Sequence, residues 1–260
     1  MRTELETAVE AAVAAGEVLR ENFGGRQNVT YKGEVDLVTE VDGEAERVVL
    51  EVLRRVFPNY GVLAEEGGEI PGESELRWIV DPLDGTTNYA HGFPAFAVSI
   101  ALERAGEVLI GVVHDPISGE TYVAERGGGA TLNGRTLRVS GTEELLRSLL
   151  ATGFPYDRSD MPEALELFGR FSKLTQGMRR VGAAALDLCY VAAGRLDGYY
   201  ESGVKAWDIA AGSLILEEAG GRVTGYGGGE LDLQSEELVA TNGPLHPALL
   251  EVIRASPGPP

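Results

Sequence analysis

Two aspartates three residues apart, Asp81 and Asp84, directly follow the short apolar segment 76–80. Where a strand passes into a turn, carboxylates at this spacing can point toward one place, and Pro82 stiffens the chain between them. The backbone carbonyl of Leu83 adds another oxygen, and hard cations such as Mg2+ bind oxygen ligands of this kind. Aspartate is also an ordinary turn residue, so a plain Asx turn is the competing interpretation of these positions taken alone.

The next two residues, Gly85 and Thr86, extend the motif with backbone donors. Glycine lets the backbone approach a ligand closely. A short helix that opens here and runs through Thr87 and Asn88 would present its N–H groups to an anion. Carboxylates that hold metal ions, beside N–H groups that hold phosphate, are the parts that metal-assisted phosphoryl transfer requires. The run 81–88 therefore predicts a site for that chemistry.

Acidic residues at two other places could join this site. Glu65 and Glu66 follow the apolar segment 61–64, and adjacent like charges at the end of a strand are unfavourable without a nearby cation. Asp208 lies at the start of a predicted helix through 209–219, where an aspartate is also a good N-cap. A solvated acidic loop and a helix cap are the simpler interpretations of these positions taken one at a time.

The charge balance limits the possible partners. The 260 residues include 41 acidic and 22 basic side chains, a formal net charge of −19. Such a surface repels nucleic acids and anionic lipids, so we expect neither nucleic-acid nor membrane partners. An anionic phosphate substrate would be repelled too, unless cations bound to the carboxylates reverse the local charge. Solubility alone accounts for much of the acidic excess, but not for the cluster around Asp81.

Cysteine usage and hydropathy indicate a compartment. Cys189 is the only cysteine, so no disulfide can form within the chain, which favours a reducing environment. Glu4, Glu6 and Glu10 interrupt the apolar core that an N-terminal signal peptide needs. No run approaches the roughly 18 apolar residues of a membrane span. We therefore expect a cytoplasmic protein.

The apolar pattern predicts the elements that must position these residues. A first helix spans 3–22, with Thr3 and Glu6 as a capping box, and a second helix follows Asp42 and stops at Pro58. Strands are expected at 76–80, 96–102, 107–114 and 120–125, the last three as an antiparallel meander, with a tight turn at 133–134. Beyond residue 140, strands near 148–152, 177–181, 197–201, 222–224 and 237–241 alternate with helices at 162–174, 183–193, 207–219 and 244–255.

This change of pattern predicts two closely packed halves. Residues 1–140 would form an α+β half with an antiparallel-rich sheet and the main metal ligands. Residues 141–260 would form an α/β half with the substrate-binding elements and Asp208.

Several blocks together resemble the inositol monophosphatase family, within the magnesium-dependent, lithium-sensitive sugar phosphatases. The blocks are 35–42, 64–66, 78–88, 93–94, 98–100, 199–201, 207–210 and 218–221, so the similarity spans nearly the whole chain. The resemblance implies a layered α+β and α/β sandwich, αβαβα, like that of inositol monophosphatase and fructose bisphosphatase. The site would lie between the two halves.

The resemblance also implies roles for individual residues. Up to three Mg2+ ions would be held by Glu65, Asp81, the carbonyl of Leu83, Asp84 and Asp208. Catalytic roles would fall to Thr86, Asp42 and Glu65, with Thr86 and Asp42 positioning the attacking water. The substrate would contact Asp84, Gly85, Thr86, Gly182, Ala183, Ala184, Glu201 and Asp208. Glu201 is suited to accept hydrogen bonds from sugar or inositol hydroxyls, although a solvated strand-end carboxylate is the simpler interpretation.

One position departs from the family pattern. The usual Gly-Ser/Thr-Ala of the substrate wall is Gly182-Ala183-Ala184 here, so one hydroxyl contact is missing while the metal positions are all filled. Lys32, in the loop 28–34 beside a matching block, is a candidate for closing over the site, and surface solvation explains it equally well.

The predicted function is Mg2+-dependent hydrolysis of small phosphate monoesters by an activated water, with inositol 1-phosphate as the first candidate substrate. Fructose-1,6-bisphosphatase and 3′-phosphoadenosine nucleotide phosphatase are alternatives within the same chemistry. A catalytically silent homologue that acts as a regulatory or binding protein is the alternative from a different class. The resemblance also implies inhibition by lithium and assembly as a homodimer.

Overall fold

The structure is a computed structural model that describes residues 3–25, 29–31 and 37–255. The helices are α1 (Glu4–Asn22), α2 (Glu40–Val56), α3 (Thr86–Ala90), α4 (Met161–Leu174), α5 (Ala184–Ala192), α6 (Ala206–Glu218) and α7 (His246–Arg254), with a 3-10 turn at Leu145–Arg147. The strands before residue 140 are β1 (Val29–Tyr31), β2 (Leu37–Thr39), β3 (Gly61–Ala64), β4 (Gly68–Ile70), β5 (Leu76–Asp84), β6 (Ala97–Arg104), β7 (Glu107–Asp115), β8 (Glu120–Glu125), β9 (Gly129–Leu132) and β10 (Arg135–Thr136). The later strands are β11 (Leu149–Thr152), β12 (Gly177–Arg179), β13 (Gly198–Ser202), β14 (Arg222–Thr224) and β15 (Glu237–Thr241).

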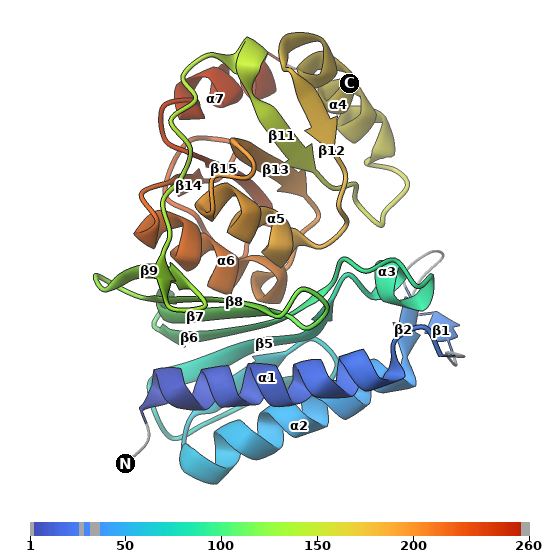
Figure 1. Cartoon of the computed structure of the whole chain (residues 1–260), viewed down its shortest axis with the longest axis vertical. Coiled ribbons are helices and arrows are strands. Elements are labelled where there is room, and N and C mark those ends of the chain that lie inside the picture. Colours follow the sequence, from blue (N-terminus) through green and yellow to red (C-terminus); the bar gives the residue numbers. More distant parts are fainter. Residues whose placement is uncertain (1–2, 26–28, 32–36, 256–260) are drawn as a thin grey trace.

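Five layers of helices and strands are stacked on one another (Figure 1). Helices α1 and α2 cover one face of an eight-stranded sheet with the order β10-β9-β8-β7-β6-β5-β3-β4. Helices α5 and α6 lie between this sheet and a five-stranded sheet with the order β12-β11-β13-β15-β14. Helices α4 and α7 cover the other face of the five-stranded sheet. The predicted αβαβα sandwich is confirmed.

Most of the predicted elements are present. Strands β6, β7 and β8 form the expected antiparallel meander, and the capping box at the start of α1 pairs Thr3 with Glu6 in both directions. Two boundaries were wrong. Helix α2 begins at Glu40, before Asp42, and strand β5 continues through the aspartate motif to Asp84. Lys32 lies outside the described residues.

Three apolar cores hold the layers together. One lies between α1, α2 and the eight-stranded sheet and contains Trp78. A second surrounds the middle helices and joins both sheets, with Leu186 and Ile215 fully buried in it. The third lies between the five-stranded sheet and the outer helices α4 and α7, around Phe171. Because the middle helices contribute to a core shared by both sheets, they position the two sheets relative to each other.

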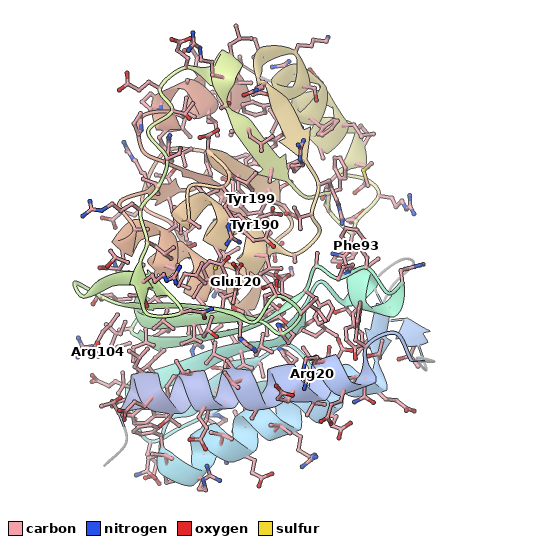
Figure 2. The ribbon with its side chains drawn as sticks, viewed as in Figure 1. Arg20, Phe93, Arg104, Glu120, Tyr190 and Tyr199 are labelled. Carbon is pink, nitrogen blue, oxygen red and sulfur yellow. The ribbon has the colours of Figure 1, made fainter. Side chains whose placement is uncertain are left out.

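Direct contacts join the two halves at this middle layer. A Cβ built on Gly111 of β7 would lie 2.6 Å from the backbone oxygen of Ala211 in α6, so helix and strand meet backbone to backbone. Arg195, just after α5, donates to Glu120 of β8 at 2.6 Å, and its guanidinium lies 5.5 Å from the ring centroid of Tyr190. Figure 2 shows Tyr190 and Glu120 on either side of this boundary. The division into domains at residue 140 stays a prediction.

None of the helices in the described ranges combines the length and apolar character that a bilayer crossing requires.

We expect Gly111→Ala to destabilise the protein by about 1–3 kcal/mol, because the added methyl group would force α6 away from β7. Urea unfolding followed by fluorescence would measure the change. The matched control is Gly141→Ala, since Gly141 is exposed and a Cβ there would meet nothing within 4 Å. Equal unfolding midpoints for the two variants would contradict this close contact.

Candidate active site

A cavity of about 250 Å3 opens between the carboxyl end of β5 and the start of the middle helices; we call it the carboxylate cavity. Its lining residues are Glu65, Asp81, Leu83, Asp84, Gly85, Thr86, Phe154, Pro155, Tyr156, Arg180, Gly182, Ala183, Ala184, Glu201, Gly203, Val204, Lys205, Trp207 and Asp208. All the site residues expected from the sequence are among them except Asp42, which lies behind Thr86.

The two aspartates of β5 face the cavity because the strand is irregular there. The register with β6 shifts between Asp81 and Asp84, so the strand carries an extra residue at the motif. Asp81 Oδ1 accepts the N–H of Leu83 at 2.9 Å. Asp84 accepts hydrogen bonds from the N–H groups of Ala184 and Ala185, at 3.1 and 2.8 Å. These two residues are the first of helix α5. A carboxylate of the first half thus caps a helix of the second half.

Asp208 enters the cavity from the first turn of α6. The expectation that it is the N-cap residue was wrong, because the helix begins at Ala206 and Lys205 is the N-cap. Asp208 instead stands at the third helical position and reaches back, so that its Oδ2 accepts the N–H of Lys205 at 2.7 Å. The Asp208 side chain also interacts with Asp81 across the cavity, and this hydrogen bond lowers the pKa of Asp208 against the larger effect of burial.

A chain of hydrogen bonds links Thr86 to the buried Asp42. Thr86 Oγ1 lies 2.9 Å from the carbonyl oxygen of Leu83 and 3.2 Å from Asp42 Oδ1. The other oxygen of Asp42 accepts the N–H of Thr39 at 2.9 Å at the start of α2. Asp42 is fully buried, and this burial raises its pKa. The fixed carboxyl therefore holds the orientation of the Thr86 hydroxyl.

Gly85 and Asn88 set the position of the short helix α3. Gly85 has φ +93°, which disfavours any residue with a side chain. A Cβ there would also lie 2.9 Å from the carbonyl oxygen of Ala95, so there is no space for one. The Asn88 amide lies within 2.9 Å of the Val181 carbonyl and 3.2 Å of the Gly182 carbonyl, and so ties α3 to the substrate wall. Asn88 belongs to the motif predicted from the sequence, but its contact with the segment 181–182 could not be predicted from its local spacing.

Sequence reasoning also missed the rim of the cavity. Arg180 and Lys205 are the two basic residues in the lining, and Phe154 and Tyr156 add aromatic surface. Arg180 lies two residues before Gly182 of the predicted substrate wall. This short spacing in the sequence could have indicated that Arg180 also lines the cavity. The aromatic residues carried no such signal, because the loop 153–160 reaches the cavity only through tertiary packing.

Burial and mutual repulsion together raise the pKa values of the aspartates in the carboxylate cavity. Burial, followed by the charges of Glu65, Asp84 and Asp208, raises the pKa of Asp81 well above its usual range. Burial and the charge of Asp208 do the same to the pKa of Asp84. The pKa of Asp208 rises to about 7, chiefly by burial. Such a site repels a phosphate dianion unless a cation binds first.

The whole chain matches the model of the inositol monophosphatase family, over residues 1–257. The chain belongs to this family. It is 46% identical to an inositol-1-monophosphatase of Mesorhizobium japonicum, over 96% of both chains. It is 45% identical to a protein named Nus factor SuhB from Pasteurella multocida, over 92% of this chain and 91% of the relative. The crystal structure of extragenic suppressor protein suhB from Bartonella henselae superposes with a TM-score of 0.93 at 42% identity, over 96% of this chain and 98% of that one.

Members of the inositol monophosphatase family are phosphatases that hydrolyse phosphate monoesters and generally depend on Mg2+. The donor set of the cavity fits such an ion, since five carboxylates and a backbone carbonyl line it and hard cations prefer oxygen. In the described part of the chain, however, no three acidic, histidine or cysteine side chains already surround one point. The carboxylates line a common cavity, and Asp81, Asp84 and Asp208 each accept a hydrogen bond from a backbone N–H group.

We expect Mg2+ to raise the melting temperature more at about pH 7.5 than at about pH 5, by about 5 °C or more. Burial raises the pKa of Asp208 from 3.8 to about 7 and that of Glu201 from 4.5 to about 7. The folded protein therefore binds more protons than the unfolded chain in this range. The stability from these groups is present below about pH 4 and is lost as the pH rises toward 7, when the unpaired charges repel.

Thermal unfolding in excess chelator and in millimolar MgCl2, at both pH values, measures this difference. The Asp81→Asn variant is the comparison, because one repelling charge is removed and the gain from Mg2+ should shrink. An equal gain from Mg2+ at both pH values would contradict the electrostatic interpretation.

Proposed function

We propose that this chain is a Mg2+-dependent phosphoric monoester hydrolase whose preferred substrate is inositol 1-phosphate or a closely related polyol phosphate. The observation that carries the proposal is the convergence of Glu65, Asp81, Asp84 and Asp208 on one cavity, beside the backbone donors of α3. These acidic residues come from positions up to 143 residues apart in the sequence. A merely structural role would not explain why two buried and two half-buried carboxylates lie together at a cost in electrostatic energy.

The residues that would hold Mg2+ are Glu65, Asp81, Asp84, Asp208 and the carbonyl of Leu83, all of which line the cavity. Bound Mg2+ supplies the positive charge that an anionic phosphate needs here, and it makes a nucleophilic water available near neutral pH. The number of ions, up to three, follows the family resemblance.

Thr86 and Asp42 would orient the attacking water. The Thr86 hydroxyl has one proton, which it donates to the Leu83 carbonyl or to Asp42. A lone pair of the hydroxyl oxygen can then accept a hydrogen bond from a water in the cavity, which would leave a lone pair of that water directed at the phosphorus. Because the Asp42 carboxyl is fixed by Thr39, the hydroxyl keeps this orientation without reorganising during the reaction.

The backbone at Gly85 and Thr86 would receive the phosphate. With Gly85 as the N-cap of α3 in a left-handed conformation, the N–H groups at the start of the helix can face the cavity and stabilise the equatorial oxygens as charge develops on them.

The alcohol part of the substrate would lie against Gly182, Ala183, Ala184 and Glu201. Ala183 offers no hydroxyl, so recognition would depend on backbone groups and on the Glu201 carboxyl. Fructose 1,6-bisphosphate and 3′-phosphorylated adenine nucleotides are the rival substrates within the same chemistry. Turnover measured across a panel of these esters would rank them.

A second candidate function is binding to another macromolecule in a regulatory role, because relatives about 45% identical to this chain are named Nus factor SuhB. Such a role is compatible with catalysis. We propose catalysis as the primary function because all the acidic positions and Thr86 are present. A cytoplasmic location and a homodimer remain proposals from the sequence.

We expect Asp81→Asn and Asp208→Asn each to lower kcat for inositol 1-phosphate by about 100-fold or more, because the site loses negative charge that would hold the Mg2+ on which phosphate binding and water activation depend. Phosphate release in the presence of Mg2+ measures the rate, and circular dichroism checks the fold. Glu73→Gln is the matched control, since Glu73 is exposed and distant from the lining residues. Activity that persists in excess chelator, or wild-type rates in both aspartate variants, would contradict the proposal.

A further inference from the structure

We propose that Gly153 and Tyr199 are positioning residues that determine substrate choice by fixing the carboxyl group of Glu201. The inference rests on the proposed function, and it assigns a role to two residues that do not line the carboxylate cavity. Both act through a side chain that does line it.

Tyr199 and Glu201 share one face of strand β13. Side chains two residues apart on a strand point to the same side. Accordingly, Tyr199 belongs to the core around the middle helices, while Tyr200 belongs to the core on the opposite side of the sheet. Figure 2 shows Tyr199 in the interior of the molecule, near the middle helices. The Tyr199 hydroxyl donates a hydrogen bond to Glu201 Oε2. Oε1 can then accept a hydrogen bond from a hydroxyl of the substrate.

Gly153 provides the space in which the Glu201 carboxyl lies. Gly153 directly follows β11, and the three atoms nearest to a Cβ built on it are Cδ, Oε1 and Oε2 of Glu201, all in severe overlap. Its φ is not in the left-handed region, so the backbone conformation does not require glycine here. The requirement comes from the carboxyl group that lies against its Cα atom.

A second cavity makes this restraint necessary. Glu201 lines both the carboxylate cavity and a neighbouring cavity of about 230 Å3, to which Gly153, Ser202 and Tyr226 also contribute. Glu201 is therefore part of the wall that the two cavities share. The Tyr199 hydroxyl binds the Glu201 carboxyl, and the absence of a side chain at position 153 leaves space for it. The carboxyl thereby stays where a substrate hydroxyl can reach it.

The consequence is selectivity for phosphate esters that carry a hydroxyl group within reach of Glu201. An ester without such a hydroxyl gains nothing from the carboxyl, and its hydrolysis should not depend on where the carboxyl lies. The two positioning residues should thus affect polyol phosphates far more than simple aryl phosphates.

The test compares kcat/KM for inositol 1-phosphate and for phenyl phosphate in the full chain with saturating Mg2+. We expect Gly153→Ala to lower the ratio of the two by about tenfold or more, and Tyr199→Phe by about threefold to tenfold, mainly through KM for inositol 1-phosphate. The methyl group added by Gly153→Ala displaces the end of a flexible side chain, so the variant should fold. Tyr60→Phe is the matched control, because the Tyr60 hydroxyl also donates to a glutamate, Glu4, at 3.0 Å but far from the cavity.

A double variant separates positioning from a general structural effect. If Gly153 acts through Glu201, then adding Gly153→Ala to Glu201→Ala should leave the ratio unchanged from that of Glu201→Ala alone. A crystal structure of Gly153→Ala should show the Glu201 carboxyl turned away from its present position.

An unchanged ratio in both single variants, additive effects in the double variant, or an unmoved carboxyl in the crystal would each overturn the inference. These outcomes differ from failure of the proposed function, in which the wild-type protein would release no phosphate from either ester. The crystal structure tests the positioning of Glu201 even in that case.

Discussion

Mutual repulsion among buried carboxylates is the constraint on which the rest of this structure depends. Asp81, Asp84 and Asp208 lie in one cavity, where burial and then the charges of Asp84 and Asp208 raise the pKa of Asp81, and burial and the charge of Asp208 raise that of Asp84. Each is held by a backbone N–H group instead of a basic side chain. Backbone donors keep the aspartates in place without neutralising them, so the negative potential that attracts divalent cations is preserved.

The layered fold is what brings these carboxylates together. Asp84 ends a strand of the eight-stranded sheet and caps helix α5, while Asp208 belongs to helix α6 of the same middle layer. The close approach of β7 and α6 at Gly111 fixes the distance between that sheet and that layer. The site therefore depends on packing far from it, because a shift of the middle helices would move Asp208 relative to Asp81 and Asp84 on β5.

In the proposed function, the side of the cavity that would bind the phosphate and the side that would bind the alcohol use different kinds of groups. The phosphate side uses charge and backbone groups, which suit any phosphate monoester. The proposed alcohol side has no side-chain hydroxyl at Ala183 and would depend on Glu201, whose carboxyl accepts from Tyr199 and lies against Gly153. The chemistry and the choice of substrate can therefore change separately in this fold.

The sequence by itself determined the order of the elements and the motif at Asp81, because apolar periodicity, turn residues and short-range spacing are local properties. The αβαβα class followed from the resemblance of its motif blocks to the inositol monophosphatase family. Tertiary structure decided the rest. Only packing across the layers could place Asp42 behind Thr86 or bring Asp84 to the N-terminus of α5, where it accepts backbone hydrogen bonds. The same packing brings the loop 153–160 to the cavity. Asp208 makes a local capping contact and also faces the distant Asp81, and only the fold shows both. Likewise, Gly153 is an ordinary turn glycine in the sequence, and its contact with Glu201, 48 residues later, exists only because β11 and β13 are neighbours.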